Sequence, residues 1–212
     1  MIKITNFEII RDNFKLGPIN LMANDGQKVL VYGLNGSGKT TMLLGLLGEL
    51  KNGGSFTIDD IEVSSLPIEK RGIAYQPATP TVIPNLKVRE ILGLANQKHD
   101  DEILLEKLNL KRLFDVKGNK LSAGQARLTQ IAAVLLSNAK IILMDEPFAF
   151  LSEELIRKVF ELMMADKRII IVTSQKKNEA FDIFLHLGDS DKGASSDFQL
   201  KARSLRETVS KF

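Results

Sequence analysis

Apolar and polar positions along this chain form two kinds of pattern, which predict strands that alternate with helices. Alternation of apolar and polar residues within 2–9 indicates antiparallel strands near the amino terminus. Largely apolar runs at 29–32, 141–144 and 168–173 are typical of strands buried on both faces of a parallel sheet. Strands that alternate with helices predict an α/β fold with a mostly parallel, doubly wound sheet.

Helices and turns fill the intervals between these strands. Apolar residues at helical spacing predict helices at 41–47, 126–137, 153–165 and 178–185. Shorter strands are expected at 55–58, 61–63 and 72–75, and the segment 183–187 is itself strand-like. Turn signals occur at 12–13, 17–18, 24–26, 51–54 and 59–60.

The pattern changes after residue 77. Prolines at 77, 80 and 84 indicate a loop, and two stretches with apolar residues at helical spacing follow, around 88–94 and 103–108. We therefore expect a helical insert within an otherwise α/β chain.

The length of 212 residues fits one large domain or two small ones, with ample material for a core. The core and a small antiparallel β subdomain are assigned to 1–77 and 139–190, the helical insert to 78–138, and a short tail to 191–212. The tail is expected to form one modest helix at most.

Composition narrows the classes of function. The net charge of +3 is mild and no long run of Lys or Arg stands out, which argues against direct binding of nucleic acid. The chain has no cysteine, so disulfides and thiolate metal sites are excluded. Its amino terminus lacks the apolar core of a signal peptide, and no apolar run is long enough to span a membrane. We expect a soluble, cytoplasmic protein that reaches a membrane only through partner subunits.

One stretch carries a complete phosphate-binding pattern. Residues 33–40 read Gly-Leu-Asn-Gly-Ser-Gly-Lys-Thr, which matches G-x-x-x-x-G-K-[ST] between a predicted strand and a predicted helix. Gly33, Gly36 and Gly38 can adopt positive φ and leave no Cβ in the way, so backbone N–H groups can wrap a phosphate at a helix amino terminus. The alternative, a glycine-rich turn with a stray lysine, is disfavoured by the flanking strand and helix.

Each residue type in this glycine loop has a chemical reason. Lys39 is expected to reach the β- and γ-phosphates, and the Thr40 hydroxyl to ligate the Mg²⁺ that a nucleotide brings with it. The pattern predicts that the chain binds a nucleoside triphosphate. The residues expected to bind it here are Gly33, Asn35, Gly36, Ser37, Gly38, Lys39, Thr40 and Thr41.

An acidic pair, Asp145 and Glu146, follows the predicted strand 141–144. Ligands of parallel sheets bind at the carboxyl ends of the strands, so both carboxylates are expected beside the glycine loop. Asp145 is expected to hold Mg²⁺, directly or through water, and Glu146 to polarise the water that attacks the γ-phosphate. The alternative is two acids that merely open a loop before Pro147, and the glycine loop makes it the weaker one.

A short stretch at 121–125, Leu-Ser-Ala-Gly-Gln, precedes the predicted helix 126–137. Ser122 is a suitable N-cap, and the small residues allow close approach of the backbone to a ligand. Taken alone, this stretch indicates the start of a helix and nothing more.

Four motifs occur in a fixed order: the glycine loop, Tyr-Gln-Pro at 75–77, Leu-Ser-Ala-Gly-Gln at 121–125, and Ile-Ile-Leu-Met-Asp-Glu-Pro at 141–147. Together they resemble an ATP-binding-cassette (ABC) ATPase, and the resemblance runs from about residue 3 to residue 188. It implies a P-loop NTPase core, a small antiparallel subdomain and an inserted helical subdomain. It also implies ATP and Mg²⁺ as ligands, and head-to-tail pairing of two such domains around two ATP molecules.

The resemblance assigns roles to residues of the other motifs. Ser122, Gly124 and Gln125 of the signature stretch would contact the nucleotide bound to the opposite subunit. Gln76 resembles the glutamine that contacts Mg²⁺ and the attacking water and links the site to the helical subdomain. In the transporter branch of the family, that subdomain docks on transmembrane partner subunits. The ATP-hydrolysing subunit of an ABC transporter is the leading interpretation, with a soluble ABC ATPase or a regulatory cassette as alternatives.

Three positions depart from the family pattern. Ala123 replaces the first glycine of the usual Leu-Ser-Gly-Gly-Gln, which is a mild change. Ser152 stands where the family has the aspartate of the D-loop, although it can still cap the helix that begins at residue 153. The histidine that the family places after the strand 169–173 is replaced by Ser174 or Gln175, depending on how the residues are counted.

The loss of this histidine bears on turnover. His99 and His186 fall elsewhere in the chain and are expected to be surface or packing residues. A positioned acid–base or orienting group contributes about 10²- to 10⁴-fold, so we expect ATP to bind and hydrolysis at the chain's own site to be slow. Pairing with a second ABC subunit is expected, and a heterodimer with one that keeps the histidine and aspartate is favoured over a homodimer.

The family also places an aromatic side chain against the adenine ring. Tyr32 lies too close to the glycine loop and is expected to face the core. Phe14 is the best candidate, near the expected turn at 12–13, and Ile10 is the alternative by spacing.

Overall fold

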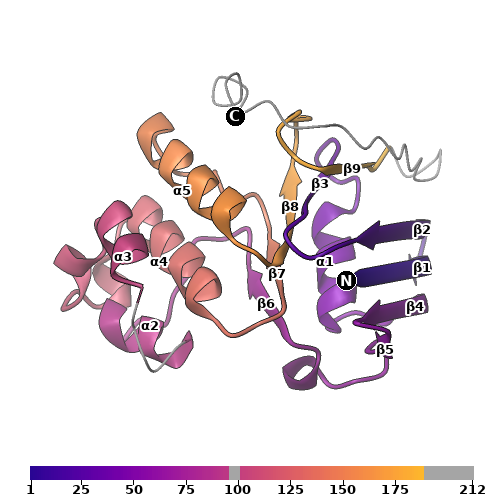
Figure 1. The fold of residues 1–212 in the computed structure, drawn as a ribbon, viewed down its shortest axis with the longest axis horizontal. Helices are drawn as coiled ribbons and strands as arrows, with labels where there is room; N and C mark the ends of the chain where they lie inside the picture. The colour runs from indigo at the N-terminus through magenta and orange to yellow at the C-terminus, as the bar shows by residue number, and fades with distance from the viewer. Residues whose placement is uncertain (96–100, 189–212) are drawn as a thin grey trace.

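The computed structural model describes residues 1–95 and 101–188, and contains two β-sheets with helices between and beside them (Figure 1). An antiparallel sheet lies on one side of helix α1 (Lys39–Leu47), and a parallel sheet lies on the other. The other helices lie on the far side of the parallel sheet, where α4 (Ala123–Leu136) and α5 (Glu153–Ala165) cover its face. The expected tail helix and His99 lie outside the described residues.

The antiparallel sheet has the strand order β2-β1-β4-β5. Its strands are β1 (Ile2–Arg11), β2 (Phe14–Ala23), β4 (Gly53–Ile58) and β5 (Ile61–Glu62). The alternation at the amino terminus therefore predicted the correct structure, since Ile2, Ile4 and Ile9 all face the core. The turn expected at 12–13 joins β1 to β2.

Two expected turns are wrong because their glycines lie within strands. Gly17-Pro18 lies inside β2, where the register against β1 shifts next to Phe7. A Cβ on Gly17 would stand 2.3 Å from the Phe7 carbonyl oxygen, so the glycine permits close approach of two strands instead of reversing the chain. Gly53 and Gly54 likewise begin β4.

The second sheet is parallel throughout, with the order β6-β7-β8-β3-β9. Its strands are β3 (Lys28–Tyr32), β6 (Ile73–Gln76), β7 (Ile141–Met144), β8 (Ile169–Ser174) and β9 (Ile183–His186). The predicted α/β class with a parallel sheet and a separate antiparallel one is confirmed.

The helix expected at 178–185 is wrong. The structure has a turn there, in which the Ala180 N–H donates to Asn178 Oδ1 at 3.1 Å, followed by the edge strand β9. β9 pairs with β3 in parallel, Leu30 opposite Phe184. A short apolar run fits either periodicity, and the open edge of the sheet decides in favour of the strand.

The remaining helices are α2 (Val88–Ala95), α3 (Glu102–Lys107), α4 (Ala123–Leu136) and α5 (Glu153–Ala165). Single 3₁₀ turns lie at Ile68–Lys70, Lys111–Leu113 and Gly118–Lys120. Helices α2, α3 and α4 lie together at one end of the molecule (Figure 1). The helices expected around 88–94 and 103–108 correspond to α2 and α3. Leu94 and Ile103 were part of that spacing but are 70% and 75% exposed.

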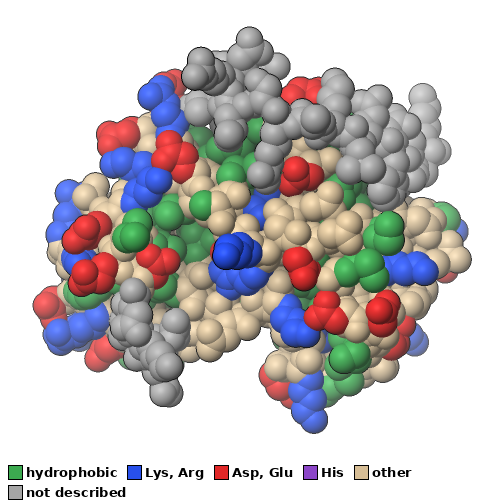
Figure 2. All heavy atoms as spheres, viewed as in Figure 1, with side chains coloured by type: hydrophobic (Ala, Val, Ile, Leu, Met, Phe, Trp, Pro, Cys, Tyr) green, Lys and Arg blue, Asp and Glu red, His purple; other side chains and the backbone are tan. Residues whose placement is uncertain are grey.

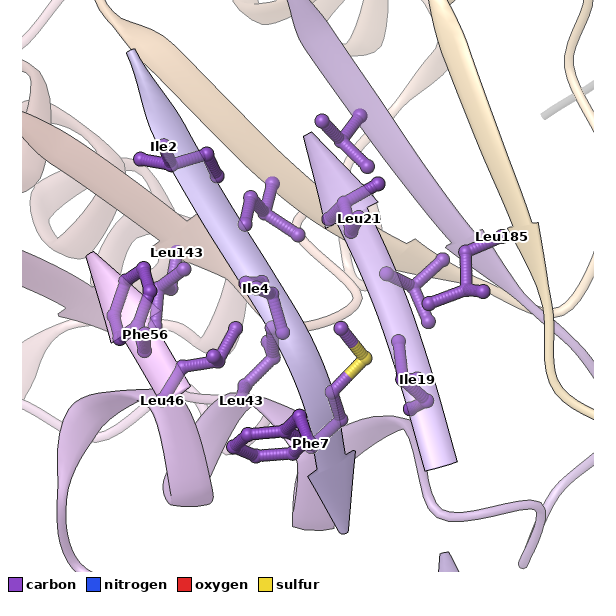
Figure 3. Packing of buried hydrophobic residues seen from close by; sticks show 14 of the residues in the cluster. Ile2, Ile4, Phe7, Ile19, Leu21, Leu43, Leu46, Phe56, Leu143 and Leu185 are labelled. Carbon is purple, nitrogen blue, oxygen red and sulfur yellow. The ribbon is translucent and has the colours of Figure 1, made fainter. Parts of the chain in front are cut away.

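The parallel sheet separates two apolar cores, because both of its faces are buried. In β7, Ile141 and Leu143 face the first core, whereas Ile142 and Met144 face the second. Figure 3 shows side chains of β1, β2, β4 and α1 in the first core, with Leu143 at one side of the group and Leu185 at the other. The second core packs the opposite face of the sheet against α4 and α5.

Charged side chains of both signs are interspersed on the face of the molecule that Figure 2 shows. Ion pairs of the described residues include Lys107 with Glu161 at 2.5 Å and Lys158 with Glu154 at 2.6 Å. Exposed pairs of this kind contribute little to stability individually.

Candidate functional site

The glycine loop joins the carboxyl end of β3 to the amino end of α1. Gly36 and Gly38 have φ of 83° and 95°, a region that a residue with a Cβ rarely adopts. Gly33 differs from the expectation because its φ is not positive. It is needed for space, since a Cβ on Gly33 would stand 2.2 Å from the Leu187 carbonyl oxygen. The Gly33 N–H donates to the Ser174 carbonyl at 3.3 Å, which fixes the start of the loop to β8.

A cavity of about 500 Å³ opens beside this loop, a size that suits a ligand of nucleotide dimensions. It brings together the glycine loop and the acidic pair, which are separated by about a hundred residues in sequence. The cavity is lined by Arg11, Asp12, Phe14, Asn35, Gly36, Gly38, Lys39, Thr40, Thr41, Asp145 and Glu146. The predicted meeting of Lys39 and Thr40 with Asp145 and Glu146 therefore occurs in the structure.

Lys39 is held in place by the loop that it follows. Its Nζ donates to the carbonyl oxygens of Gly33 at 2.9 Å and Leu34 at 3.0 Å. The same Nζ lies 3.7 Å from Glu146 Oε1, and the Lys39 side chain is only 6% exposed. The ammonium group thus stands in the cavity with its stem buried, ready to exchange these partners for phosphate oxygens.

A chain of hydroxyl and carboxylate groups joins three elements at the base of the cavity. Thr40 Oγ1 donates to Asp145 Oδ2 at 2.6 Å, and Thr173 Oγ1 donates to Asp145 Oδ1 at 2.5 Å. The Glu146 N–H then donates to Thr173 Oγ1 at 2.8 Å. Thr173, which is fully buried on β8, was not singled out from the sequence. The available signal was a polar residue near the end of a buried apolar strand.

Thr40 and Asp145 suit Mg²⁺, which prefers oxygen ligands and keeps several from water and substrate phosphates. Their oxygens already lie within 2.6 Å of one another at the edge of the cavity. Within residues 1–95 and 101–188, no group of three His, Cys, Asp or Glu residues could hold a metal by itself. An ion here would therefore depend on nucleotide oxygens for much of its coordination.

Gln76 lies apart from the cavity. Its side chain is fully buried and is not among the described residues that line the cavity. Its Nε2 donates to the carbonyl oxygens of Pro77 and, at 3.3 Å, Asp145, while Oε1 has no hydrogen-bond partner within the described part of the chain. The orphaned Oε1 is free to accept a hydrogen bond, but Gln76 does not line the cavity where Mg²⁺ is expected.

The surroundings of Glu146 shift its pKa. Burial raises its pKa above the usual range, the Lys39 ammonium opposes the rise, and the neighbouring Asp145 charge adds to it. Its φ of 46° lies in the left-handed region, which costs energy for a residue with a Cβ. A raised pKa makes Glu146 a better proton acceptor near neutral pH than an ordinary glutamate.

The signature stretch starts α4, as predicted for Ser122. Ser122 Oγ accepts from the Gln125 N–H at 3.3 Å, and Gln125 Oε1 accepts from the Ser122 N–H at 2.9 Å, which completes a capping box. Ser122 is exposed, while Gly124 and Gln125 are half-buried, and none of the three lines the cavity of its own chain.

The position expected for a histidine contains no ionisable group in contact with the cavity. Ser174 is half-buried, and its Oγ accepts from the Lys176 N–H at 3.2 Å. Gln175 is exposed, and neither residue is among those that line the cavity. His186 ends β9 and packs on Tyr32, with ring centroids 4.8 Å apart. The interpretation of His186 as a packing residue is consistent with this contact.

Ser152 occupies the N-cap position of α5, as expected, but its side chain makes no hydrogen bond to the helix. The structure distinguishes between Phe14 and Ile10, the two candidates for contact with the base. Phe14 lines the cavity and approaches the glycine loop, whereas Ile10 is 63% exposed and does not line it. Phe14 is therefore the aromatic side chain in position to meet a base.

Comparison with known proteins agrees with this geometry. The sequence profile of the family described as ABC transporter matches residues 16–149, more than half of the chain. The chain belongs to the ABC transporter family. No helix of this family member in the two described segments is long and apolar enough to cross a membrane.

Several curated ABC relatives are ATP-binding proteins. The lipopolysaccharide export system ATP-binding protein LptB of Escherichia coli K12 is 35% identical over 145 residues, covering 62% of this chain and 60% of that protein. LptB of Haemophilus influenzae is 30% identical over 182 residues, covering 78% and 76%. A probable branched-chain amino acid transport ATP-binding protein, LivF of Archaeoglobus fulgidus, is 31% identical over 169 residues, covering 72% of each.

Solved ABC structures share the fold. An ATP-binding cassette in a dimeric post-hydrolysis state with ADP and Pi aligns with a TM-score of 0.77 at 24% identity, over 96% of this chain and 100% of that one. A putative ABC transporter ATP-binding protein from Pyrococcus furiosus aligns with a TM-score of 0.74 at 23% identity, over 88% and 96%.

Proposed function

We propose that this chain is the ATP-binding and ATP-hydrolysing subunit of an ABC transporter, which couples ATP-driven dimerisation to transport through membrane partner subunits. The observation that carries the proposal is the cavity in which Lys39 and Thr40 face Asp145 and Glu146. The proposal takes the chain as one ABC-type unit, with its core and β subdomain at 1–77 and 139–190 and its helical insert at 78–138.

The glycine loop would bind the phosphates of ATP. Gly36 and Gly38, with positive φ, turn the backbone so that its N–H groups can face an anion at the start of α1. Lys39 would leave the carbonyls of Gly33 and Leu34 for the β- and γ-phosphates. Thr40 and Asp145 would hold Mg²⁺, which when bound neutralises part of the phosphate charge. Phe14 is proposed to stack on the base.

Glu146 would act on the attacking water. With its raised pKa and its place at the cavity wall, its carboxylate can take a proton as the water oxygen bonds to the γ-phosphorus and the bond to the β–γ bridging oxygen breaks. Thr173 holds the Glu146 N–H and Asp145 Oδ1 together, so both acids keep their spacing. Gln76 is proposed to join the site only after a shift of the loop that follows β6.

The site is proposed to be completed by a second ABC subunit. Ser122, Gly124 and Gln125 lie outside their own cavity and are proposed to contact ATP bound to the facing subunit. Neither Ser174 nor Gln175 supplies an ionisable group, and Ser152 carries no charge, so slow turnover at this chain's own site is expected. A heterodimer with a subunit that keeps the histidine and aspartate is therefore favoured.

The membrane attachment is proposed to be peripheral, on the cytoplasmic side and through transmembrane subunits. The names of two relatives refer to lipopolysaccharide export and to branched-chain amino acid transport, and both describe an ATP-binding protein. These names support transport as the role and ATP as the bound nucleotide.

The test is affinity capture from native membranes with tagged Glu146→Gln in the presence of ATP, which slows hydrolysis and holds the closed dimer. Recovery of a transmembrane subunit, together with a second cassette that contains the histidine, is expected. The matched control is the double variant Lys39→Met with Glu146→Gln, which binds the phosphates more weakly and, at an ATP concentration that saturates only the single variant, should recover much less of both. Equal recovery by both variants, or recovery of no membrane protein by either, would contradict the proposal.

A further inference from the structure

The loop after β6 is held by a buried arginine of α4. The Arg127 guanidinium donates to the carbonyl oxygens of Pro77, at 2.6 Å, and Ala78. These are the first two residues after Gln76, so the guanidinium is hydrogen-bonded to the backbone at the point where the loop leaves the sheet. Arg127 stands two residues after Gln125, the last residue of the signature stretch.

Gln130, one helical turn further along α4, holds the next part of the same loop. Its Nε2 donates to the carbonyl oxygens of Thr79 at 2.9 Å and Thr81 at 2.6 Å. Its Oε1 accepts from Arg127 Nη1 at 3.3 Å, so the two side chains are also joined to each other. Four carbonyls of the loop 77–81 are thus bound by two adjacent side chains of one helix.

Arg127 also contacts the loop that carries the acidic pair. Its guanidinium carbon lies 5.8 Å from the centre of the Phe150 ring, four residues after Glu146. A Cβ on Gly124 would stand 2.9 Å from the Phe150 carbonyl oxygen, so the start of α4 abuts this loop directly. The first two turns of α4 therefore touch the loops that follow both β6 and β7.

The buried positive charge of Arg127 destabilises the fold unless the guanidinium has a role that compensates for it. Arg127 is fully buried, and its Nε has no hydrogen-bond partner within the described residues. Burial lowers the pKa of Arg127, while the nearby charges of Asp145 and Glu146 oppose that effect. An apolar side chain of similar length would pack without these costs, which indicates that the guanidinium serves a purpose beyond packing.

We propose that Arg127, supported by Gln130, is a positioning residue that ties the signature helix to the loop 77–81. Resting on the proposed function, the inference is that contact of Ser122–Gln125 with a nucleotide across a dimer shifts α4. Arg127 carries that shift to the loop, which then brings Gln76 to the site. One side chain thereby couples the signature of this chain to the chain's own acidic pair.

A tryptophan reporter tests this coupling, because the sequence contains no tryptophan. Thr79 has an exposed side chain, and only its carbonyl takes part in the contact with Gln130, so Thr79→Trp places a single probe on the loop. In a Glu146→Gln background, ATP with Mg²⁺ is expected to change the tryptophan emission. Adding Arg127→Met should abolish that change while ATP affinity, measured with a fluorescent ATP analogue, stays within about threefold.

Turnover gives an independent readout without the Glu146 substitution. Arg127→Met is expected to lower kcat about 10- to 100-fold, since a misplacement of about 1 Å can cost that much, with the KM for ATP changed less than about threefold. Arg127→Lys, which can still donate to one carbonyl, should recover part of both signals. Gln130→Met provides a second disruption of the same loop contact if Arg127→Met folds poorly.

Arg168 supplies the matched control, since its guanidinium binds carbonyls at the other end of α4, those of Leu135 and Ser137, each at 2.6 Å. Arg168→Met should lower the Tm yet keep the ATP-dependent emission change. The proposal is overturned if Arg127→Met and Gln130→Met keep the emission change, or if Arg168→Met loses it equally. It is also overturned if the parent reporter binds ATP without any emission change, whereas absence of ATP binding by the parent would instead overturn the proposed function.

Discussion

Lys39 Nζ lies 3.7 Å from Glu146 Oε1, so the cation proposed to bind phosphate and the carboxylate proposed to accept a proton face each other across the cavity. The Glu146 side chain keeps 30% of its surface exposed, whereas Lys39 is almost entirely buried. When the Lys39 ammonium binds a phosphate, its positive charge is partly neutralised and lowers the pKa of Glu146 less. Nucleotide binding should therefore make Glu146 a stronger base.

Substitution of Lys39 tests the phosphate contact. Lys39→Met should weaken ATP binding about 10- to 150-fold, because hydrogen bonds to charged groups contribute about 1.5–3 kcal/mol. The measurement is titration with a fluorescent ATP analogue. Lys28 is the matched control, as it is a fully buried lysine whose Nζ binds the carbonyls of Gly26, Asp166 and Arg168 at the other end of β3. Lys28→Met should reduce the Tm and leave ATP affinity unchanged, and the reverse pattern would refute the assignment.

The raised pKa of Glu146 predicts a pH-dependent change in stability. The folded state binds the Glu146 proton more tightly than the unfolded state, so ionisation of this group costs stability. The cost is absent at pH values below the ordinary value near 4.5 and grows as pH rises through the raised pKa. Glu146→Gln should therefore raise the free energy of unfolding at about pH 7.5 and leave it nearly unchanged near pH 4. Urea unfolding at both pH values measures this, and a stability gain that is larger at the acidic pH would disprove it.

Substitution of Thr173, a residue outside the recognised motifs, is expected to lower turnover. Thr173→Val keeps the shape of the side chain but removes the hydroxyl shared by Asp145 Oδ1 and the Glu146 N–H. We expect kcat to fall about 10- to 100-fold through misplacement of the acids, with ATP affinity retained. Thr173→Ser, which keeps the hydroxyl, should restore most of the rate. If valine and serine behave alike, the hydroxyl does not position the acids.

Substitution of Gln175 by histidine is expected to increase ATPase activity. Gln175→His places an ionisable group on an exposed position directly after β8, and we expect ATP turnover of the purified chain to rise at least about tenfold, within the range of a positioned acid–base group. Ser174→His serves as the comparison, since Ser174 is half-buried and its hydroxyl is already bound to the Lys176 N–H. That variant should give no gain. A parent rate typical of the family, unchanged by Gln175→Ala, would show that the chain needs no histidine.

Much of the fold could be predicted from the sequence, because the strands carry strong signals. The run 141–144 is apolar at every position, and the structure buries both of its faces. The helix predicted at 178–185 was wrong because its five apolar residues fit strand and helix alike, and only the free edge beside β3 distinguishes them. The turn predicted at Gly17 was wrong because a glycine that relieves crowding between strands gives the same sequence signal as a glycine in a turn.

Residues of the site that belong to a sequence motif could be predicted. Residues that reach the site only through contacts made in the folded protein could not. Lys39, Thr40, Asp145 and Glu146 meet as expected, since motifs at the carboxyl ends of parallel strands share one edge. Arg127 could not be singled out, because an arginine in a helix is usually exposed. Only the packing of α4 against the loop 77–81 buries it.

The position of β3 in the sheet has a consequence for biosynthesis. β3 leads into the glycine loop but pairs only with β8 and β9, the last two strands of the described chain to leave the ribosome. Until then, Gly33 has neither the Ser174 carbonyl that accepts its N–H nor the Leu187 backbone beside it. A nascent chain that ends before β8 therefore carries the complete phosphate-binding motif with no site to bind ATP. Nucleotide can assist the folding of this protein only after β8 and β9 have been synthesised, and a variant that lacks these two strands should lose binding while keeping every motif intact.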